Sequence, residues 1–105
     1  MKVIYNNILP AKGFAAINIF GILFVRRGVV VSERMLNHER IHSAQMKELL
    51  YVFFYILYVM EWIVRLFKYH LNSYYNISFE REAYAHELDL NYLKKRKLWA
   101  WMKEM

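Results

Sequence analysis

Cysteine is absent from this chain, and the residues that loosen or break a backbone are scarce, with 3 glycines and 1 proline among 105 residues. Without cysteine the fold has no disulfide and no thiolate metal site, which is consistent with a reducing compartment. The scarcity of glycine and proline leaves no flexible tract that could separate two domains. We therefore expect residues 1–105 to form a single domain.

The sequence also lacks patterns typical of a secretory signal and of nucleic-acid binding. The first residues, Met1–Ile8, lack a long apolar core and a small-residue cleavage site, so we expect no removed secretory signal. Basic residues exceed acidic ones, giving a formal net charge of +6, but they do not alternate with stacking aromatics as in nucleic-acid-binding modules. We expect no nucleic-acid partner and a location that is cytoplasmic or at a membrane.

The order of local patterns predicts an α+β fold. Phe14–Phe20, Ile22–Val25 and the shorter run Val29–Val31 are rich in β-branched and aromatic residues, which predicts a small antiparallel sheet or hairpin. Turn-forming residues punctuate this part of the chain: Pro10, Gly13, Gly21 and Gly28.

Helices are predicted after the strands. Ser32 is a suitable N-cap for a helix that begins at Glu33, and neither glycine nor proline occurs from there to Asn72. One long helix or two abutting helices are both compatible with this stretch, and we expect a break near residues 47–51. Residues 68–77 contain several turn-forming side chains and predict a loop.

A histidine pair on the first predicted helix indicates a metal site. His38 and His42 are four residues apart and would share one helical face, where both imidazoles can reach one zinc ion. Two such nitrogens and a third protein ligand leave one tetrahedral position free for water. Glu39 could take a proton from that water as a general base, which is the chemistry of a zinc peptidase.

A third ligand should come from a separate element. Ser78 is a suitable N-cap for a helix from Phe79 to about Lys97, and Glu80 would lie in its first turn, where a carboxylate suits the helix dipole. Glu82 is a rival for the same role. The two carboxylates point about 200° apart on a helix, so only one of them can face the metal.

These residues resemble a known family of peptidases. The motif His38–His42, followed by Gln45 and by Glu80-Arg81-Glu82-Ala83-Tyr84, resembles the gluzincin pattern HExxHxxQ with a downstream ExxA[DY]. Small single-domain members, the minigluzincins, have about this length. The resemblance implies a zincin-like fold, a Zn²⁺ cofactor, peptide substrates and Glu80 as the third ligand. Tyr84 stands where the membrane gluzincins usually have aspartate.

The resemblance also implies how a substrate would bind. In gluzincins an edge strand beside the metal holds the peptide through main-chain hydrogen bonds. The candidate here is Ile17–Val25, although these strands could equally serve only to cover the helices; the substrate-strand candidates are Ile17, Ile19, Gly21 and Leu23. Residues that could contact a zinc ligand or donate to the oxyanion of the reaction are Gln45, Tyr74, Tyr75, Tyr84 and His70.

The run Leu49–Phe67 is very apolar, and its first twelve residues carry no polar group other than tyrosine hydroxyls. Twelve residues are too few to span a bilayer, and a longer span would bury Glu61 and Arg65, which could pair at helical spacing. The run predicts either a helix that backs the active-site helix or a surface for a membrane or an apolar protein partner.

Three functions therefore stay open on the sequence alone. The first is a zinc-dependent peptidase with Glu39 as general base. The second is a catalytically inactive or structural zinc-binding domain. The third is a membrane-associated helical interaction protein in which the HExxH pattern is accidental.

Overall fold

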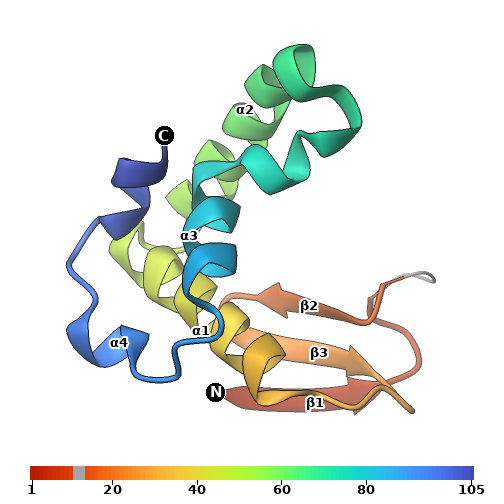
Figure 1. Ribbon diagram of the computed structural model, residues 1–105. Helices are drawn as coiled ribbons and strands as arrows, with labels where there is room; N and C mark the ends of the chain where they lie inside the picture. Colours follow the sequence, from red (N-terminus) through yellow and green to blue (C-terminus); the bar gives the residue numbers. More distant parts are fainter. Residues whose placement is uncertain (11–13) are drawn as a thin grey trace.

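A three-stranded sheet at the N-terminal end precedes all the helices, which confirms the predicted α+β class (Figure 1). The computed structural model describes residues 1–10 and 14–105, so Gly13, expected in a turn, lies outside the described residues. Figure 1 shows the sheet on one side of the molecule, α1 running next to it, and α2 extending away from it.

The sheet contains one strand that the sequence did not predict. Strand β1 (Lys2–Asn6) pairs in parallel with β3 (Ile22–Arg26), and β2 (Ala16–Ile19) pairs with β3 in antiparallel fashion. The predicted hairpin is therefore β2–β3, and the addition of β1 makes the sheet mixed. In this order, β1-β3-β2, the central strand β3 is covered on both edges, whereas β2 is an edge strand.

The predicted short strand Val29–Val31 is wrong. Gly28 adopts a φ of 90°, in the left-handed region that favours glycine, and the amide of Val29 donates to the carbonyl of Arg26 at 3.2 Å. These two features close a turn directly after β3. The valines consequently connect the sheet to the first helix without regular secondary structure.

Helix α1 (Glu33–Glu48) begins as predicted, since the Ser32 side chain accepts a hydrogen bond from the amide of Met35 at 3.1 Å. The predicted break is also confirmed. Leu50 and Tyr51 have φ values of 53° and 62°, and α2 (Val52–Tyr69) leaves at an angle of 110° to α1. The amide of Tyr51 donates to the carbonyl of Met46 at 2.7 Å, which holds this sharp bend.

Two short 3₁₀ helices, η1 (His70–Asn72) and η2 (Tyr74–Asn76), lead from α2 to α3 (Ser78–His86). Ser78 is not the N-cap of α3, contrary to prediction, because Ile77 occupies that position. The amide and hydroxyl of Ser78 instead each donate to the Glu61 carboxylate of α2 at 2.6 Å. Glu61 thus acts in place of a local cap, and it also pairs with Arg65 at 3.6 Å as predicted.

The prediction of one helix from Phe79 to about Lys97 is wrong, because α3 ends at His86 and is followed by α4 (Tyr92–Lys95) and η3 (Ala100–Glu104). The amide nitrogen of Asn37, on α1, donates to the carbonyls of His86, Glu87 and Asp89 at 2.9–3.2 Å. Such a side chain satisfies the last carbonyls of a helix and ends it through a contact distant in sequence.

The main core lies where α1, α2, α3 and η3 meet, and consists of Met46, Leu49, Phe54, Ile77, Phe79 and Trp101. A smaller cluster joins α1, α3 and α4 through Ile41, Ala83 and Tyr92. Among the described residues no single helix is both long and apolar enough to cross a membrane; α1 and α2 together satisfy those two criteria but are bent by 110°.

A buried ion network fastens the C-terminal segment to the helices. The Arg96 guanidinium donates to Glu82 on α3 at 2.5 Å and to Glu48 on α1 at 2.8 Å, and all three side chains are at most 6 % exposed. Burial would raise the pKa of Glu82, but hydrogen bonds from Arg96, Gln45 and Tyr92 hold that pKa below its ordinary value. Glu82 is therefore a structural ion-pair partner.

We expect the substitution Arg96→Met to destabilise the fold by about 3–5 kcal/mol, because it leaves two buried carboxylates without their cation. Urea unfolding followed by circular dichroism would measure this loss. The exposed Arg27 provides a matched control, and Arg27→Met should change the free energy of unfolding by less than about 0.5 kcal/mol. Equal effects of the two substitutions would contradict the importance of the network.

Candidate metal centre

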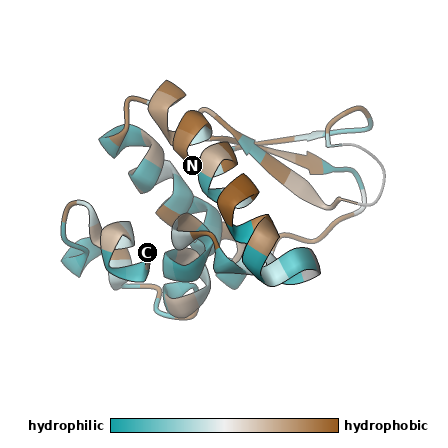
Figure 2. Ribbon diagram, turned by 90° about the horizontal axis from the view of Figure 1, so that it is seen from above, coloured by the Kyte–Doolittle hydropathy of each residue, from teal (hydrophilic) through white to brown (hydrophobic). Residues whose placement is uncertain are grey.

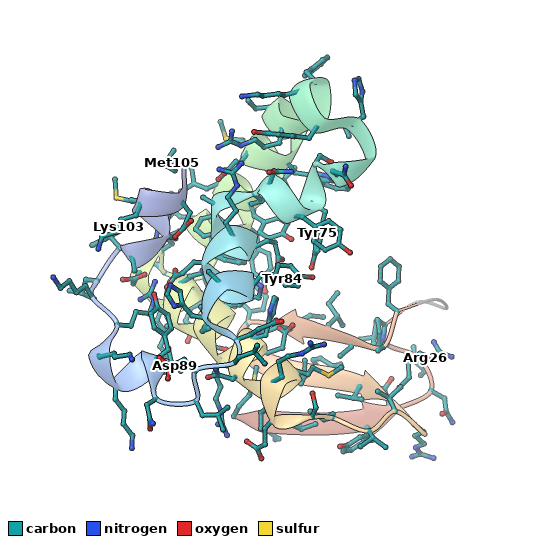
Figure 3. The ribbon with its side chains drawn as sticks, viewed as in Figure 1. Arg26, Tyr75, Tyr84, Asp89, Lys103 and Met105 are labelled. Carbon is teal, nitrogen blue, oxygen red and sulfur yellow. The ribbon has the colours of Figure 1, made fainter. Side chains whose placement is uncertain are left out.

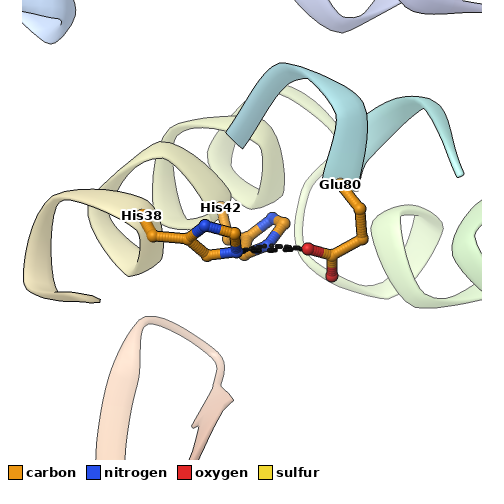
Figure 4. A group of neighbouring side chains, drawn as sticks. All are labelled: His38, His42 and Glu80. Atoms are coloured by element: carbon orange, nitrogen blue, oxygen red, sulfur yellow. Dashed lines mark hydrogen bonds and ion pairs between the residues drawn. The ribbon is translucent and has the colours of Figure 1, made fainter. Parts of the chain in front are cut away.

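His38 and His42 lie one turn apart on the buried face of α1, as the helical spacing predicts (Figure 4). Their Nε2 atoms are 3.1 Å apart, and their ring centroids are 4.8 Å apart with the planes steeply inclined. Both side chains are buried, at 8 % and 5 % relative exposure. The two imidazoles therefore point their Nε2 atoms at one place.

Helix α3 brings Glu80 to the same place (Figure 4). Its Oε1 atom lies 3.1 Å from His38 Nε2 and 3.0 Å from His42 Nε2. Zinc bonds of about 2.0–2.1 Å in a tetrahedron require ligand atoms about 3.3 Å apart, so an ion fits after outward shifts of a few tenths of an ångström. Among the described residues, this is the one cluster of three potential ligands close enough to hold a metal ion.

Each histidine has an acceptor on its other ring nitrogen. His38 Nδ1 lies 2.7 Å from Glu87 Oε2, and His42 Nδ1 lies 2.8 Å from Gln45 Oε1. Since a carboxylate and an amide oxygen accept hydrogen bonds, both Nδ1 atoms carry the proton and both Nε2 atoms keep a lone pair in the neutral rings. This is the tautomer that binds a metal through Nε2.

The orientation of Gln45 is itself determined by its surroundings. Its Nε2 atom donates to the carbonyl of Phe79 at 3.0 Å and to Glu82 Oε1 at 2.9 Å, both on α3. Its oxygen must therefore face His42. Gln45 is fully buried and joins α1 to α3 directly beside Glu80.

The electrostatics of the cluster require a proton or a cation. Two nitrogen lone pairs and a carboxylate oxygen about 3 Å apart repel one another if all three are unprotonated. Burial lowers the pKa of His42, but the charge and hydrogen bond of Glu80 outweigh it and raise that pKa to about 9. Burial likewise acts to raise the pKa of Glu80, yet His42 and the hydrogen bonds from His38, His42 and Tyr58 hold it well below its usual range. A metal ion would satisfy all three atoms.

Two contacts to the cluster were not predicted from the sequence. Tyr58 on α2 donates its hydroxyl to Glu80 Oε2 at 2.6 Å, which leaves Oε1 for the point shared with the histidines. The second contact is that of Glu87 with His38. Glu87 follows Glu80 by about two helical turns and so lies on the same helical face, which is a sequence pattern that could have predicted this contact. Tyr58 lies within a long apolar run in which no pattern distinguishes it from its neighbours.

A cleft of about 650 Å³ opens beside the cluster, between β2 and the helices. Its polar lining includes Glu39, His42 and Glu80, and the rest is mostly apolar, with Ala16, Ile17, Ile19, Phe20, Met46 and Phe54 among the lining residues. Within the part of the chain that the structure describes, the side chains of Asn18 and Ser43 donate to the backbone carbonyl of Glu39, and no side chain forms a hydrogen bond or ion pair with the Glu39 carboxylate. The Glu39 carboxylate is therefore free to act on a molecule in the cleft.

The tyrosines and the histidine that were predicted to contact a zinc ligand or an oxyanion differ in how close they lie to the His38, His42 and Glu80 cluster. Tyr74 lines the cleft, and the Tyr84 ring packs edge-on against His38 with centroids 4.6 Å apart. Tyr75 packs against Tyr84 at 5.4 Å, and the two lie side by side in Figure 3. His70 is exposed at the end of α2 and is not part of the cleft lining. Glu82, the rival of Glu80, pairs with Arg96 instead.

Of the four substrate-strand candidates, two line the cleft and two do not. Ile17 and Ile19 lie on the edge strand β2 and line the cleft. Leu23 lies on the central strand β3, which is paired on both sides, and is fully buried, so it cannot offer a free edge. Gly21, with a φ of 87°, forms the turn between the two strands.

The metal-free protein should lose stability as the pH rises through about 9. The folded pKa of His42, about 9, exceeds its ordinary value of 6.5, so the stabilisation from its ionic contact with Glu80 is complete below pH 6.5 and is lost above pH 9. We expect the urea midpoint, measured in a chelator, to fall between about pH 6 and about pH 10. The fall should be smaller in Glu80→Gln. If the urea midpoint of Glu80→Gln falls as much as that of the wild type over this pH range, the contact between His42 and Glu80 is not the cause of the fall.

Comparison of the chain with protein-family models, with curated proteins and with solved structures finds no match in any of the three. The site is therefore described by its own geometry: a buried His38, His42 and Glu80 group that is compatible with a zincin-like metal centre.

Proposed function

We propose that this protein is a zinc-dependent peptidase of gluzincin type. The observation that supports this most is the convergence of His38 Nε2, His42 Nε2 and Glu80 Oε1, at 3.0–3.1 Å from one another, next to a cleft that also contains Glu39. Two neutral imidazoles and one carboxylate form a ligand set that zinc accepts, and three protein ligands leave a position for chemistry.

In this proposal the chemistry is divided between the ion and the chain. Zinc, when bound, would supply a Lewis acid that polarises a peptide carbonyl and acidifies a water molecule. Glu39 would act as the general base: it would accept a proton from the attacking water and pass that proton to the leaving amine. Glu39 suits this role because it lines the cleft and directly follows the potential ligand His38 in sequence.

Two tyrosines have distinct roles in the proposal. Tyr58 fixes Glu80 through the 2.6 Å hydrogen bond to Oε2. Tyr74 lines the cleft beside Glu80, and both burial and the Glu80 charge raise its pKa, so its hydroxyl keeps its proton. A protonated hydroxyl at that position can donate to the oxyanion that forms during attack.

The substrate in this proposal is an extended peptide with apolar side chains, held along β2. Ile17 and Ile19 line the cleft from the edge strand, and Phe54, Tyr55 and Tyr58 line it from α2. The Tyr55 hydroxyl already donates to the carbonyl of Asn18 and accepts from the amide of Phe20. The free part of the edge therefore begins before Asn18, towards Ala16.

Zinc binding tests the ligand set independently of activity. In calorimetric titrations, wild-type protein should bind one Zn²⁺, and Glu87→Ala should weaken binding by about 10- to 100-fold because it removes the acceptor of His38 Nδ1. Glu80→Gln removes a ligand and should weaken binding by a larger factor. Glu33→Gln, an exposed position in the first turn of α1, is the control and should bind like the wild type. Unchanged affinity in Glu80→Gln would refute this ligand set.

Peptide cleavage tests the proposed base. With zinc-loaded protein and a library of quenched-fluorescence peptides, Glu39→Gln should lower kcat by about 10²- to 10⁴-fold while zinc stoichiometry stays the same, because the change removes the base but no ligand. Glu33→Gln again serves as the control. Zinc binding without cleavage by the wild type would instead indicate a structural zinc site.

A further inference from the structure

Helix α2 turns its apolar side chains outward. Every residue that is exposed along it is apolar except Lys68, and several are extensively exposed, with Val64 at 66 % and Phe67 at 83 %. Figure 2 shows hydrophobic colour along most of this helix. We define the outward apolar face by its members, which are Val52, Phe53, Ile56, Leu57, Val59, Met60, Trp62, Ile63, Val64, Leu66 and Phe67.

The inward side of α2 is the more polar one. Tyr55, Tyr58 and Glu61 point inward, where they contact β2, Glu80 and Ser78 through hydrogen bonds of 2.6–3.1 Å. These contacts fix the rotation of the helix about its axis. A change of rotation that hid the outward apolar face would break them, so the exposure of that face is a stable feature of the fold.

The outward apolar face is wider than a single partner helix covers. At about 100° per residue, it spans an arc of about 220°, whereas a helix packed against one neighbour buries a stripe of about 100°. A second copy of this chain paired through α2 would leave much of the arc in water. A lipid phase, by contrast, surrounds the whole exposed arc at once.

We propose that the outward apolar face of α2 inserts into the surface of a bilayer that contains anionic phospholipids, with the helix lying along the surface. The inward contacts keep one side of α2 against the protein body, so only the outer arc can enter the acyl region, as in interfacial helices. Trp62 lies at one margin of the arc, with its indole Nε1 donating to Ser73 at 3.0 Å and its ring 45 % exposed. Such a half-exposed indole suits the boundary between headgroups and acyl chains.

The charge of the chain favours anionic lipid. The formal net charge is +6, and cations lie at the C-terminal end of α2, where Lys68 is exposed at the margin of the apolar arc. A basic protein is attracted to a negatively charged leaflet before any apolar contact forms. Binding should therefore weaken as salt is added, and neutral vesicles should bind less than anionic ones.

Vesicle flotation of the full chain tests the proposal. Wild-type protein should float with vesicles of phosphatidylcholine and phosphatidylglycerol, and the double variant Ile56→Glu/Ile63→Glu, at the centre of the arc, should bind the vesicles at least about tenfold less strongly. The matched control is Val30→Glu/Leu88→Glu, whose residues are 88 % and 77 % exposed outside α2. It adds the same two negative charges and should float much more than the α2 variant.

A second measurement does not depend on how well the double variant folds. Tryptophan fluorescence of the wild type should be quenched by lipids that carry a nitroxide near the headgroup, and Trp62→Phe should remove most of that quenching. Wild-type protein that stays in the aqueous fraction and elutes as a dimer would overturn the proposal in favour of a protein interface. Equal flotation of the α2 variant and the control would overturn it as well.

Discussion

The side chain of Gln45 joins α1 to α3 at the point on which the rest of the site depends. A single buried amide accepts from His42 and donates to the backbone of Phe79 and to Glu82. These three hydrogen bonds set both the separation of the helices and the orientation of one imidazole. Glu80 lies between the partners of Gln45 in sequence, so its carboxylate meets the histidines as a consequence of this crossing. In a chain without disulfides, such buried polar contacts favour one arrangement of the helices over the alternatives.

The sequence predicted the convergence of the three potential ligands because their placement follows from local rules. A spacing of four residues puts His38 and His42 on one helical face, and a spacing of two residues turns Glu80 and Glu82 about 200° away from each other. The partners of these residues depend on contacts between helices. Tyr58 on α2 meets Glu80 on α3 only in the folded chain, and no pattern along the sequence encodes that meeting.

The same distinction explains the errors in the fold. Ser32 was predicted as a cap because capping acts within a few residues, and the break expected near residues 47–51 lies where Leu50 and Tyr51 have positive φ values. Strand β1 was missed because its parallel pairing joins segments about 20 residues apart, and no local pattern along the chain marks such a pair. The length of α3 was overestimated because Asn37, on another helix, supplies the groups that end it.

The 110° bend between α1 and α2 has a mechanical consequence. One side of α2 forms a wall of the cleft through Phe54 and Tyr55 and holds Glu80 through Tyr58, while the opposite side carries the outward apolar face. A contact on the outer side of α2 would therefore act on the same helix that lines the cleft and holds Glu80. The structure shows the cleft as it is when nothing covers the outer side of α2. A displacement of α2 would change both the width of the cleft and the position of Glu80 relative to the two histidines.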